Sequence, residues 1–258
     1  MIDIQPQHVT LDQLVYGRLF RIPQYQRTYS WRKKQRQDLF EDIRRAAEKE
    51  CSHFMATIVG LRREKRTIMT KEHQVIEVVD GQQRITTLIL LLKAIAKVID
   101  RSDPIGGKIG KELDDTLVKD DKATLLLLQT NHDISHYFAD YLRTGNQPPS
   151  EAADTLADRE LLSAIEECER FVTNWQSAGN SLEDLVSLLK NLALRNNFVV
   201  SKVELHSREV PFDQLPIVIQ RIMANWGRMS IMDTKPFMPP ATLHSIFGHK
   251  PPVIGTPA

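Results

Sequence analysis

The stretch EVVDGQQRITTL, residues 77–88, combines the groups that a phosphate-binding turn needs. Gly81 lets the backbone turn tightly and approach a ligand closely, and the N–H groups that follow it are unsatisfied donors at the positive end of a predicted helix. Arg84 carries a permanent charge on a planar fork that binds phosphate oxygens in pairs. Amide and hydroxyl side chains that can complete such a site are Gln82, Gln83, Thr86 and Thr87. The stretch therefore predicts an anion-binding corner.

Asp80, in the same turn, suggests that a cation accompanies the bound phosphate. A carboxylate repels a polyphosphate unless a positive ion lies between them, so Asp80 is predicted to bind Mg²⁺, directly or through water, or to orient an attacking water. Asp80, Gln83 and Arg84 are then the candidate catalytic residues. The structural alternative is an ordinary Asp-Gly turn that Arg84 closes by pairing with Glu77 or Asp80.

Residues 23–31, PQYQRTYSW, form a second polar and aromatic stretch. On an extended chain, residues two apart share a face, so Tyr25, Arg27 and Tyr29 are expected to point the same way. Such a set could stack on a base and hold a phosphate. The alternative is a half-buried strand with an outward arginine.

A basic run follows at residues 62–66, within the sequence LRREKR. Its four cations are Arg62, Arg63, Lys65 and Arg66. They could contact DNA phosphates, because cations displace the counterions condensed on DNA. The alternative is a solvated hairpin tip.

Two further candidates concern metal binding and thiol chemistry. His132 and His136 lie four residues apart, a spacing that lets two imidazoles share a metal on a helix. No third ligand with a clear role accompanies them, and packing is the alternative. Cys51 and Cys168 lack a partner motif, so neither is expected to act as a nucleophile.

The hydrophobic pattern predicts a mixed α/β arrangement for the first hundred residues. Pro23 forces its predecessor away from α-helical geometry, so residues 21–31 are predicted to be extended. A helix is predicted from Arg32 onward, and strands over residues 54–61 and 74–79, joined by an exposed hairpin loop at the basic run. Apolar residues at intervals of three and four predict a long amphipathic helix after Gly81.

The remainder reads as mostly helical. Residues 101–123 are rich in glycine and charge and are predicted to be a mobile connection. Apolar stripes predict three helices near residues 134–142, 162–175 and 182–192, and residues 198–205 predict a late strand that returns to the sheet. We therefore expect a site-bearing domain over residues 1–100, a helical region over 101–205, and an uncertain, partly disordered tail over 206–258.

Length and charge set wider bounds. The chain has 258 residues and a net charge of +1, which excludes a uniformly basic nucleic-acid binder. Residues 1–100 nevertheless carry 18 basic and 12 acidic side chains, so an anionic ligand is expected there. Two cysteines are too few for a disulfide framework, and neither a secretory signal nor a long apolar run is present. A cytoplasmic protein without a membrane span is expected.

The order of four segments resembles a known family. IPQYQRTYSW, LFEDI, HFMATIVG and EVVDGQQRITTL occur in the order found in the DGQQR-motif (DUF262) domain of GmrSD-type restriction systems. The match spans about residues 22–92. The resemblance implies an α/β (α+β) fold of ParB/sulfiredoxin type, with a small mixed sheet and a following helical region.

The resemblance also implies a function. Members of the family bind and hydrolyse nucleoside triphosphates at the DGQQR site and act in bacterial defence against phage DNA. The resemblance implies that the same site in this chain comprises the residues of the motif and of the facing segment: Asp80, Gly81, Gln82, Gln83, Arg84, Tyr25, Gln26 and Arg27. Its expected partners are a nucleotide, DNA and an HNH-type nuclease domain or subunit, since no HNH signature is found in this chain, and a homo-oligomer is possible. A ParB-like DNA-binding module that uses the nucleotide only as a switch, and a metal-dependent nuclease, are the alternative functions.

Overall fold

The computed structural model of the chain describes residues 7–49, 54–120, 125–131, 135–149, 151 and 153–199. All of them belong to one structural unit, Met1–Lys202. The predicted tail at 206–258, as well as Cys51 and His132, lies outside the described residues.

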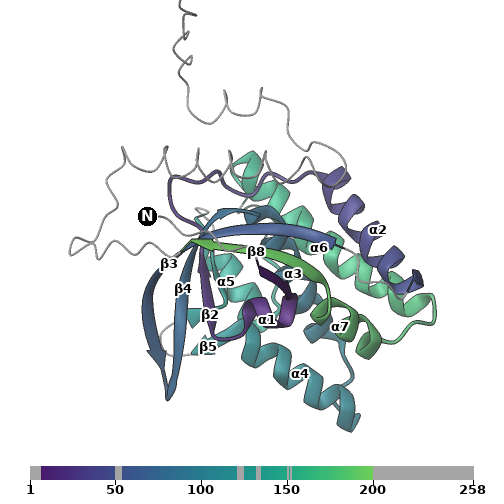
Figure 1. Ribbon diagram of the computed structural model, residues 1–258. Coiled ribbons are helices and arrows are strands. Elements are labelled where there is room, and N and C mark those ends of the chain that lie inside the picture. Colours follow the sequence, from purple (N-terminus) through teal and green to yellow (C-terminus); the bar gives the residue numbers. More distant parts are fainter. Residues whose placement is uncertain are drawn as a thin grey trace, which may run out of the picture. The chain divides into compact units, whose positions relative to one another are not determined.

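The described strands form one mixed sheet and one small ribbon (Figure 1). They are β1 (Gln7–Thr10), β2 (Arg18–Arg21), β3 (Phe54–Ile68), β4 (Lys71–Asp80), β5 (Val118–Asp120), β6 (Leu125–Leu126), β7 (Leu128–Gln129) and β8 (Ala193–Val199). The sheet has the order β1-β8-β3-β4-β2-β7, while β5 pairs with β6. Antiparallel pairs join β1 to β8 and β3 to β4, whereas β2–β4, β2–β7 and β3–β8 are parallel. The late strand therefore returns to the sheet, but it begins at Ala193 rather than at 198.

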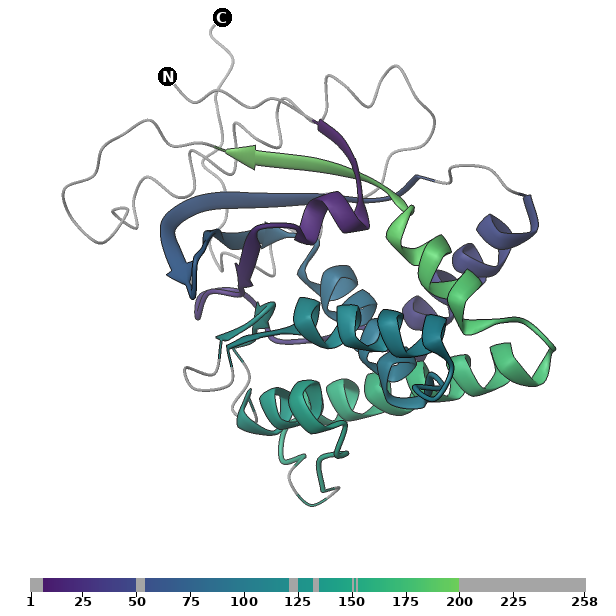
Figure 2. The same cartoon turned by 90° about the horizontal axis from the view of Figure 1, so that it is seen from below.

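The described helices gather on one side of the sheet (Figure 2). They are α1 (Leu11–Val15), α2 (Lys33–Lys49), α3 (Gln82–Val98), α4 (Pro104–Leu117), α5 (Ser135–Thr144), α6 (Leu156–Ser177) and α7 (Leu182–Lys190). The combination of a mixed sheet with these helices confirms the predicted α+β class. No helix in the described part of the chain is long and apolar enough to cross a membrane.

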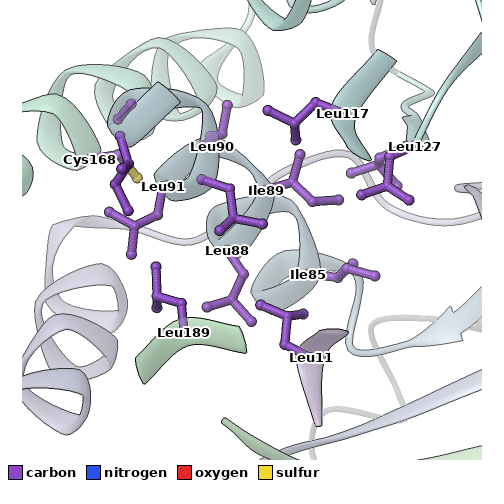
Figure 3. Packing of buried hydrophobic residues seen from close by; sticks show 14 of the residues in the cluster. Leu11, Ile85, Leu88, Ile89, Leu90, Leu91, Leu117, Leu127, Cys168 and Leu189 are labelled. Carbon is purple, nitrogen blue, oxygen red and sulfur yellow. The ribbon is translucent and has the colours of Figure 1, made fainter. Parts of the chain in front are cut away.

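Helix α3 runs through the centre of the hydrophobic core. Four successive residues, Leu88 to Leu91, are all fully buried, and their side chains point to different sides of the helix (Figure 3). The surrounding side chains include Leu11, Leu117, Leu127, Cys168 and Leu189. The single apolar stripe read from the sequence thus understates the burial, because a helix that is apolar on all sides is enclosed on all sides. This packing holds the start of α3 in a fixed place.

The predicted mobile connection at 101–123 is wrong, because most of it forms α4. Asp103 caps the helix by accepting hydrogen bonds from the N–H groups of Ile105 and Gly106, and Pro104 occupies the first turn. Gly106 permits a close approach, since a Cβ there would lie 2.2 Å from the carbonyl oxygen of Asp100. Glycine here serves packing rather than flexibility.

The basic run is also placed differently from its prediction. Residues 62–66 belong to the long strand β3, and the turn of the hairpin lies at Met69 and Thr70. Within β3 a bulge sets Arg63 and Glu64 against Val75 alone, as the pairings on either side of it show. The bulge turns Arg63 toward β4.

Candidate functional site

The predicted corner is present between β4 and α3. Gly81 separates the two elements with φ 88°, a left-handed conformation that favours glycine. A Cβ at this position would lie 2.9 Å from the carbonyl oxygen of Thr57, so the corner also presses closely against β3. The Gly81 N–H donates a hydrogen bond to the Asp80 carboxylate at 2.8 Å. Among the described residues no side chain caps the start of α3, so the N–H groups of its first turn have no side-chain acceptor.

Residues 23–31, called the strap from here on, cover the inner side of this helix start. Gln83 binds the strap through both atoms of its side-chain amide. Its Oε1 accepts hydrogen bonds from the N–H groups of Ser30 at 2.7 Å and Trp31 at 3.2 Å. Its Nε2 donates to the carbonyl oxygen of Thr28 at 3.1 Å. The neighbouring Gln82 donates to the carbonyl oxygen of Arg27 at 2.7 Å. Both motif glutamines are buried and bound to the strap, and their predicted contacts to a nucleotide stay predictions.

The other end of the strap is held by amides as well. Gln26 donates to the carbonyl oxygen of Val79 at 3.0 Å. Asn131 donates to the carbonyl oxygens of Pro23 at 3.1 Å and Gln26 at 2.6 Å. Nothing in the sequence around Asn131 marked it as part of the site.

The strap is not a regular strand, so the expected shared face of Tyr25, Arg27 and Tyr29 is wrong. A turn at Pro23–Gln26, closed by the Gln26 N–H on the Pro23 carbonyl at 3.0 Å, breaks the alternation. Tyr25 and Arg27 are exposed, whereas Tyr29 is buried and its hydroxyl shares a hydrogen bond with that of Thr87 at 2.8 Å. The hydroxyls of both motif threonines also donate to carbonyl oxygens of α3.

Arg84 sits where the strap ends. Its guanidinium lies over the Trp31 ring, 5.5 Å from the ring centroid. The Nε atom is buried and has no hydrogen-bond partner among the described residues. Burial lowers the pKa of Arg84, against the opposite effect of the nearby carboxylates of Asp42 and Asp80. Since a buried unpartnered donor is costly, this atom is a candidate for an anionic partner.

Asp80 keeps contact with solvent at the outer side of the corner. Surrounding protein atoms raise the pKa of the Asp80 carboxyl, and this desolvation outweighs the opposite effects of the Gly81 N–H and of two guanidinium groups. The two groups belong to Arg27 and Arg84, so both arginines lie near this carboxylate. Of the alternative pairings for Arg84, the one with Glu77 is not observed among the described residues, whereas Asp80 lies near enough for a charge interaction.

The inner side of the corner is nearly closed. A cavity of about 10 Å³ lies between the strap and α3, which is room for about one water molecule. It is lined by Ile22, Tyr29, Gln82, Gln83, Thr86 and Thr130. Two oxygens at this place, Oε1 of Gln82 and Oγ1 of Thr130, are buried without a hydrogen-bond partner among the described residues. This cavity is too small to hold a nucleotide.

Glu77 binds two of the predicted ligand-binding side chains, Tyr25 and Arg63, together with Arg21. It accepts hydrogen bonds from Arg63 at 2.9 and 3.0 Å, from the Tyr25 hydroxyl at 2.7 Å and from Arg21 at 3.4 Å. Burial alone would raise the Glu77 pKa, but these hydrogen bonds and charges outweigh it, and the pKa is lowered. The predicted DNA contact of Arg63 and nucleotide contact of Tyr25 stay predictions, and both side chains are held by Glu77.

A buried ionic network, which the sequence did not reveal, ties the strap to α6. Arg36 in α2 is 1% exposed. It donates to both carboxylate oxygens of Glu167 at 2.9 and 3.0 Å, and to Glu160 at 2.9 Å. The same guanidinium donates to the carbonyl oxygen of Trp31. The residue that packs on Arg84 is thereby anchored to the helical side of the molecule.

Asp80 is the residue predicted to bind Mg²⁺. Among the described residues, no group of three or more His, Cys, Asp or Glu side chains could hold a metal ion. Mg²⁺ beside a nucleotide is commonly held by one or two carboxylates together with the phosphates, so a single accessible Asp80 fits that arrangement. Of the proposed histidine pair, His136 is exposed and its ring lies 4.0 Å from that of Tyr137.

Comparison with known proteins gives one match. A family model described as the N-terminal domain of the GmrSD restriction endonuclease matches residues 10–215. No curated protein matches the chain. The matched range includes the strap, the corner and every described helix.

Proposed function

We propose, from the premise that this chain belongs to the family of GmrSD restriction endonuclease N-terminal domains, that its β4–α3 corner binds and hydrolyses a nucleoside triphosphate. The family assigns the chain a role in restriction. In our proposal hydrolysis controls that role, and an HNH-type nuclease domain or subunit cuts the DNA.

One observation carries the proposal. The start of α3 has no side-chain cap, and beside it the buried Nε of Arg84 has no partner among the described residues. Helix starts and arginine forks are the two groups with which proteins most directly bind phosphate. The fixed position of α3 in the core supports the same use, because catalysis of phosphoryl transfer depends on positioning and charge.

The residues of the motif divide into an inner and an outer set. Gln82 and Gln83 face inward and hold the strap, which keeps Trp31 against Arg84. Arg27 is exposed and Arg84 is half-buried, and both lie near Asp80, where they would contact the phosphates. Asp80 would hold Mg²⁺ or orient the attacking water. When bound, Mg²⁺ would neutralise charge on the phosphates.

Phosphate release from GTP and ATP in the presence of Mg²⁺ tests the proposal. Arg84→Ala is expected to lower kcat/KM by about 10³-fold, as loss of a phosphate-stabilising arginine does. Asp80→Asn is expected to lower it by roughly 10²-fold. Lys111→Ala, which removes an exposed cation from α4, is the matched control and is expected to leave turnover unchanged.

Calorimetric binding of a non-hydrolysable nucleotide separates the possible outcomes. The proposal predicts binding by the wild type and at least tenfold weaker binding by Arg84→Ala. Binding without turnover in the wild type would assign the corner to a nucleotide switch instead. Absence of both binding and turnover, or an unchanged Arg84→Ala variant, would show that the corner is only a structural turn.

A further inference from the structure

The hairpin of β3 and β4 continues past the neighbouring strands of the sheet (Figure 1). Strand β2 pairs with β4 only from Gln74 onward, and β8 pairs with β3 only as far as Leu61 among the described residues. Beyond these limits, as far as the described strands show, β3 and β4 pair only with each other, from Arg66 with His73 to Ile68 with Lys71. This projecting part is called the β-ribbon below and comprises residues 62–73.

The β-ribbon is rich in accessible positive charge. It contains five basic and two acidic side chains. Arg63 is held by Glu77 at the bulge, but the other four cations are exposed: Arg62, Lys65, Arg66 and Lys71. Lys65 pairs with Glu72 and Arg66 with Glu64, both at the surface. Exposed pairs of this kind contribute only about 0–1 kcal/mol, so phosphate groups can displace them.

The tip of the β-ribbon presents an apolar side chain to solvent. Met69 is 90% exposed, and its backbone is left-handed with φ 53°. A non-glycine residue in this conformation is strained, and no buried contact of the Met69 side chain offsets the strain. Methionine is among the apolar side chains that DNA-bending proteins insert between base steps.

We propose that the β-ribbon is a contact site for duplex DNA, entering a groove with Met69 at its tip while Arg62, Lys65, Arg66 and Lys71 bind backbone phosphates. A twisted two-stranded ribbon fits the major groove of B-form DNA. The bulge strengthens the twist and leaves Arg63 out of the contact. The inference rests on the restriction role of the family and is independent of the nucleotide site.

Fluorescence anisotropy with a labelled 30-base-pair duplex tests the site on the full chain. The variant Arg66→Gln/Lys71→Gln removes two exposed cations from one face of the ribbon. Its affinity at low salt is expected to fall at least tenfold, and the slope of log affinity against log salt to decrease by about 2, because each phosphate contact contributes about 0.9. The matched control, Lys108→Gln/Lys111→Gln on α4, makes the same charge change elsewhere and is expected to bind as the wild type does.

The variant Met69→Ser tests the contribution of the apolar tip to DNA binding separately from that of the charged side chains. It is expected to weaken binding severalfold without changing the salt slope, because a thioether makes no ionic contact. Equal loss in both double variants, an unchanged β-ribbon variant, or a wild type that does not bind duplex DNA would overturn the inference. Phosphate release without DNA should be the same in the wild type and the β-ribbon variant. Failure of this proposal is therefore distinguishable from failure of the nucleotide site.

Discussion

Replacing Gly81 by alanine tests whether the corner depends on both its backbone conformation and its close contact with β3. An alanine with φ near 88° costs about 1–2 kcal/mol in backbone strain. Its Cβ would also lie 2.9 Å from the Thr57 carbonyl oxygen, which must move. Forcing a methyl group into a packed site costs roughly 1–3 kcal/mol. The two effects together predict a loss of about 2–5 kcal/mol in the free energy of unfolding.

Gly179→Ala is the matched control. Gly179 has φ 83°, and a Cβ there would meet nothing within 4 Å, so only the strain applies. Urea unfolding of both variants should give Gly81→Ala the larger loss by about 1–3 kcal/mol, the contact contribution alone. The loss of unfolded-state entropy on changing glycine to alanine is common to both variants and cancels. Equal losses in the two variants would refute the argument that β3 constrains the corner.

The remaining predictions concern two charged clusters. Glu77→Gln should lower the free energy of unfolding by about 2 kcal/mol at pH 7, because it leaves the partly buried Arg63 without its counter-ion. Since the Glu77 pKa is lowered by folding, its stabilisation is present above the ordinary carboxyl pKa and is lost as pH falls through the folded value. The difference between wild type and variant in urea unfolding should therefore shrink below about pH 4, and a constant difference would contradict this cause. Arg36→Met should cost about 3 kcal/mol, because Glu160 and Glu167 lose their common partner, and adding Glu160→Gln and Glu167→Gln should restore part of it in thermal unfolding. No recovery would mean that packing, rather than unpaired charge, causes the loss.

The corner was predictable because its signals are local. A β-rich segment that ends in Asp80–Gly81 and is followed by apolar residues at helical spacing specifies a strand, a turn and a helix without reference to the rest of the chain. The family match over residues 10–215 confirms the resemblance that the DGQQR motif suggested. The start of α7 has a local signal too: Ser181 is followed three residues later by Asp184, and the Ser181 hydroxyl caps the helix by accepting a hydrogen bond from the Asp184 N–H at 3.0 Å.

The hydrogen bonds that hold the strap were not predictable, because they join residues far apart in the sequence. Gln83 bonds to Ser30, and Asn131 to Gln26, across separations that no periodic pattern encodes. The mistake at 101–123 had a different origin. Glycine was taken as a sign of flexibility, although Gly106 allows α4 to pack closely against the preceding turn.

The unpaired edges of the β-ribbon have a consequence for self-association. Among the described strands, both edges near the tip expose backbone N–H and C=O groups, which in a flat, uncharged ribbon would invite a second copy to add strand to strand. Lysine and arginine side chains and a bulge are the usual protection against such aggregation, and this hairpin carries all three. Mutual repulsion between like-charged ribbons thus opposes the pairing of this protruding element with its copies.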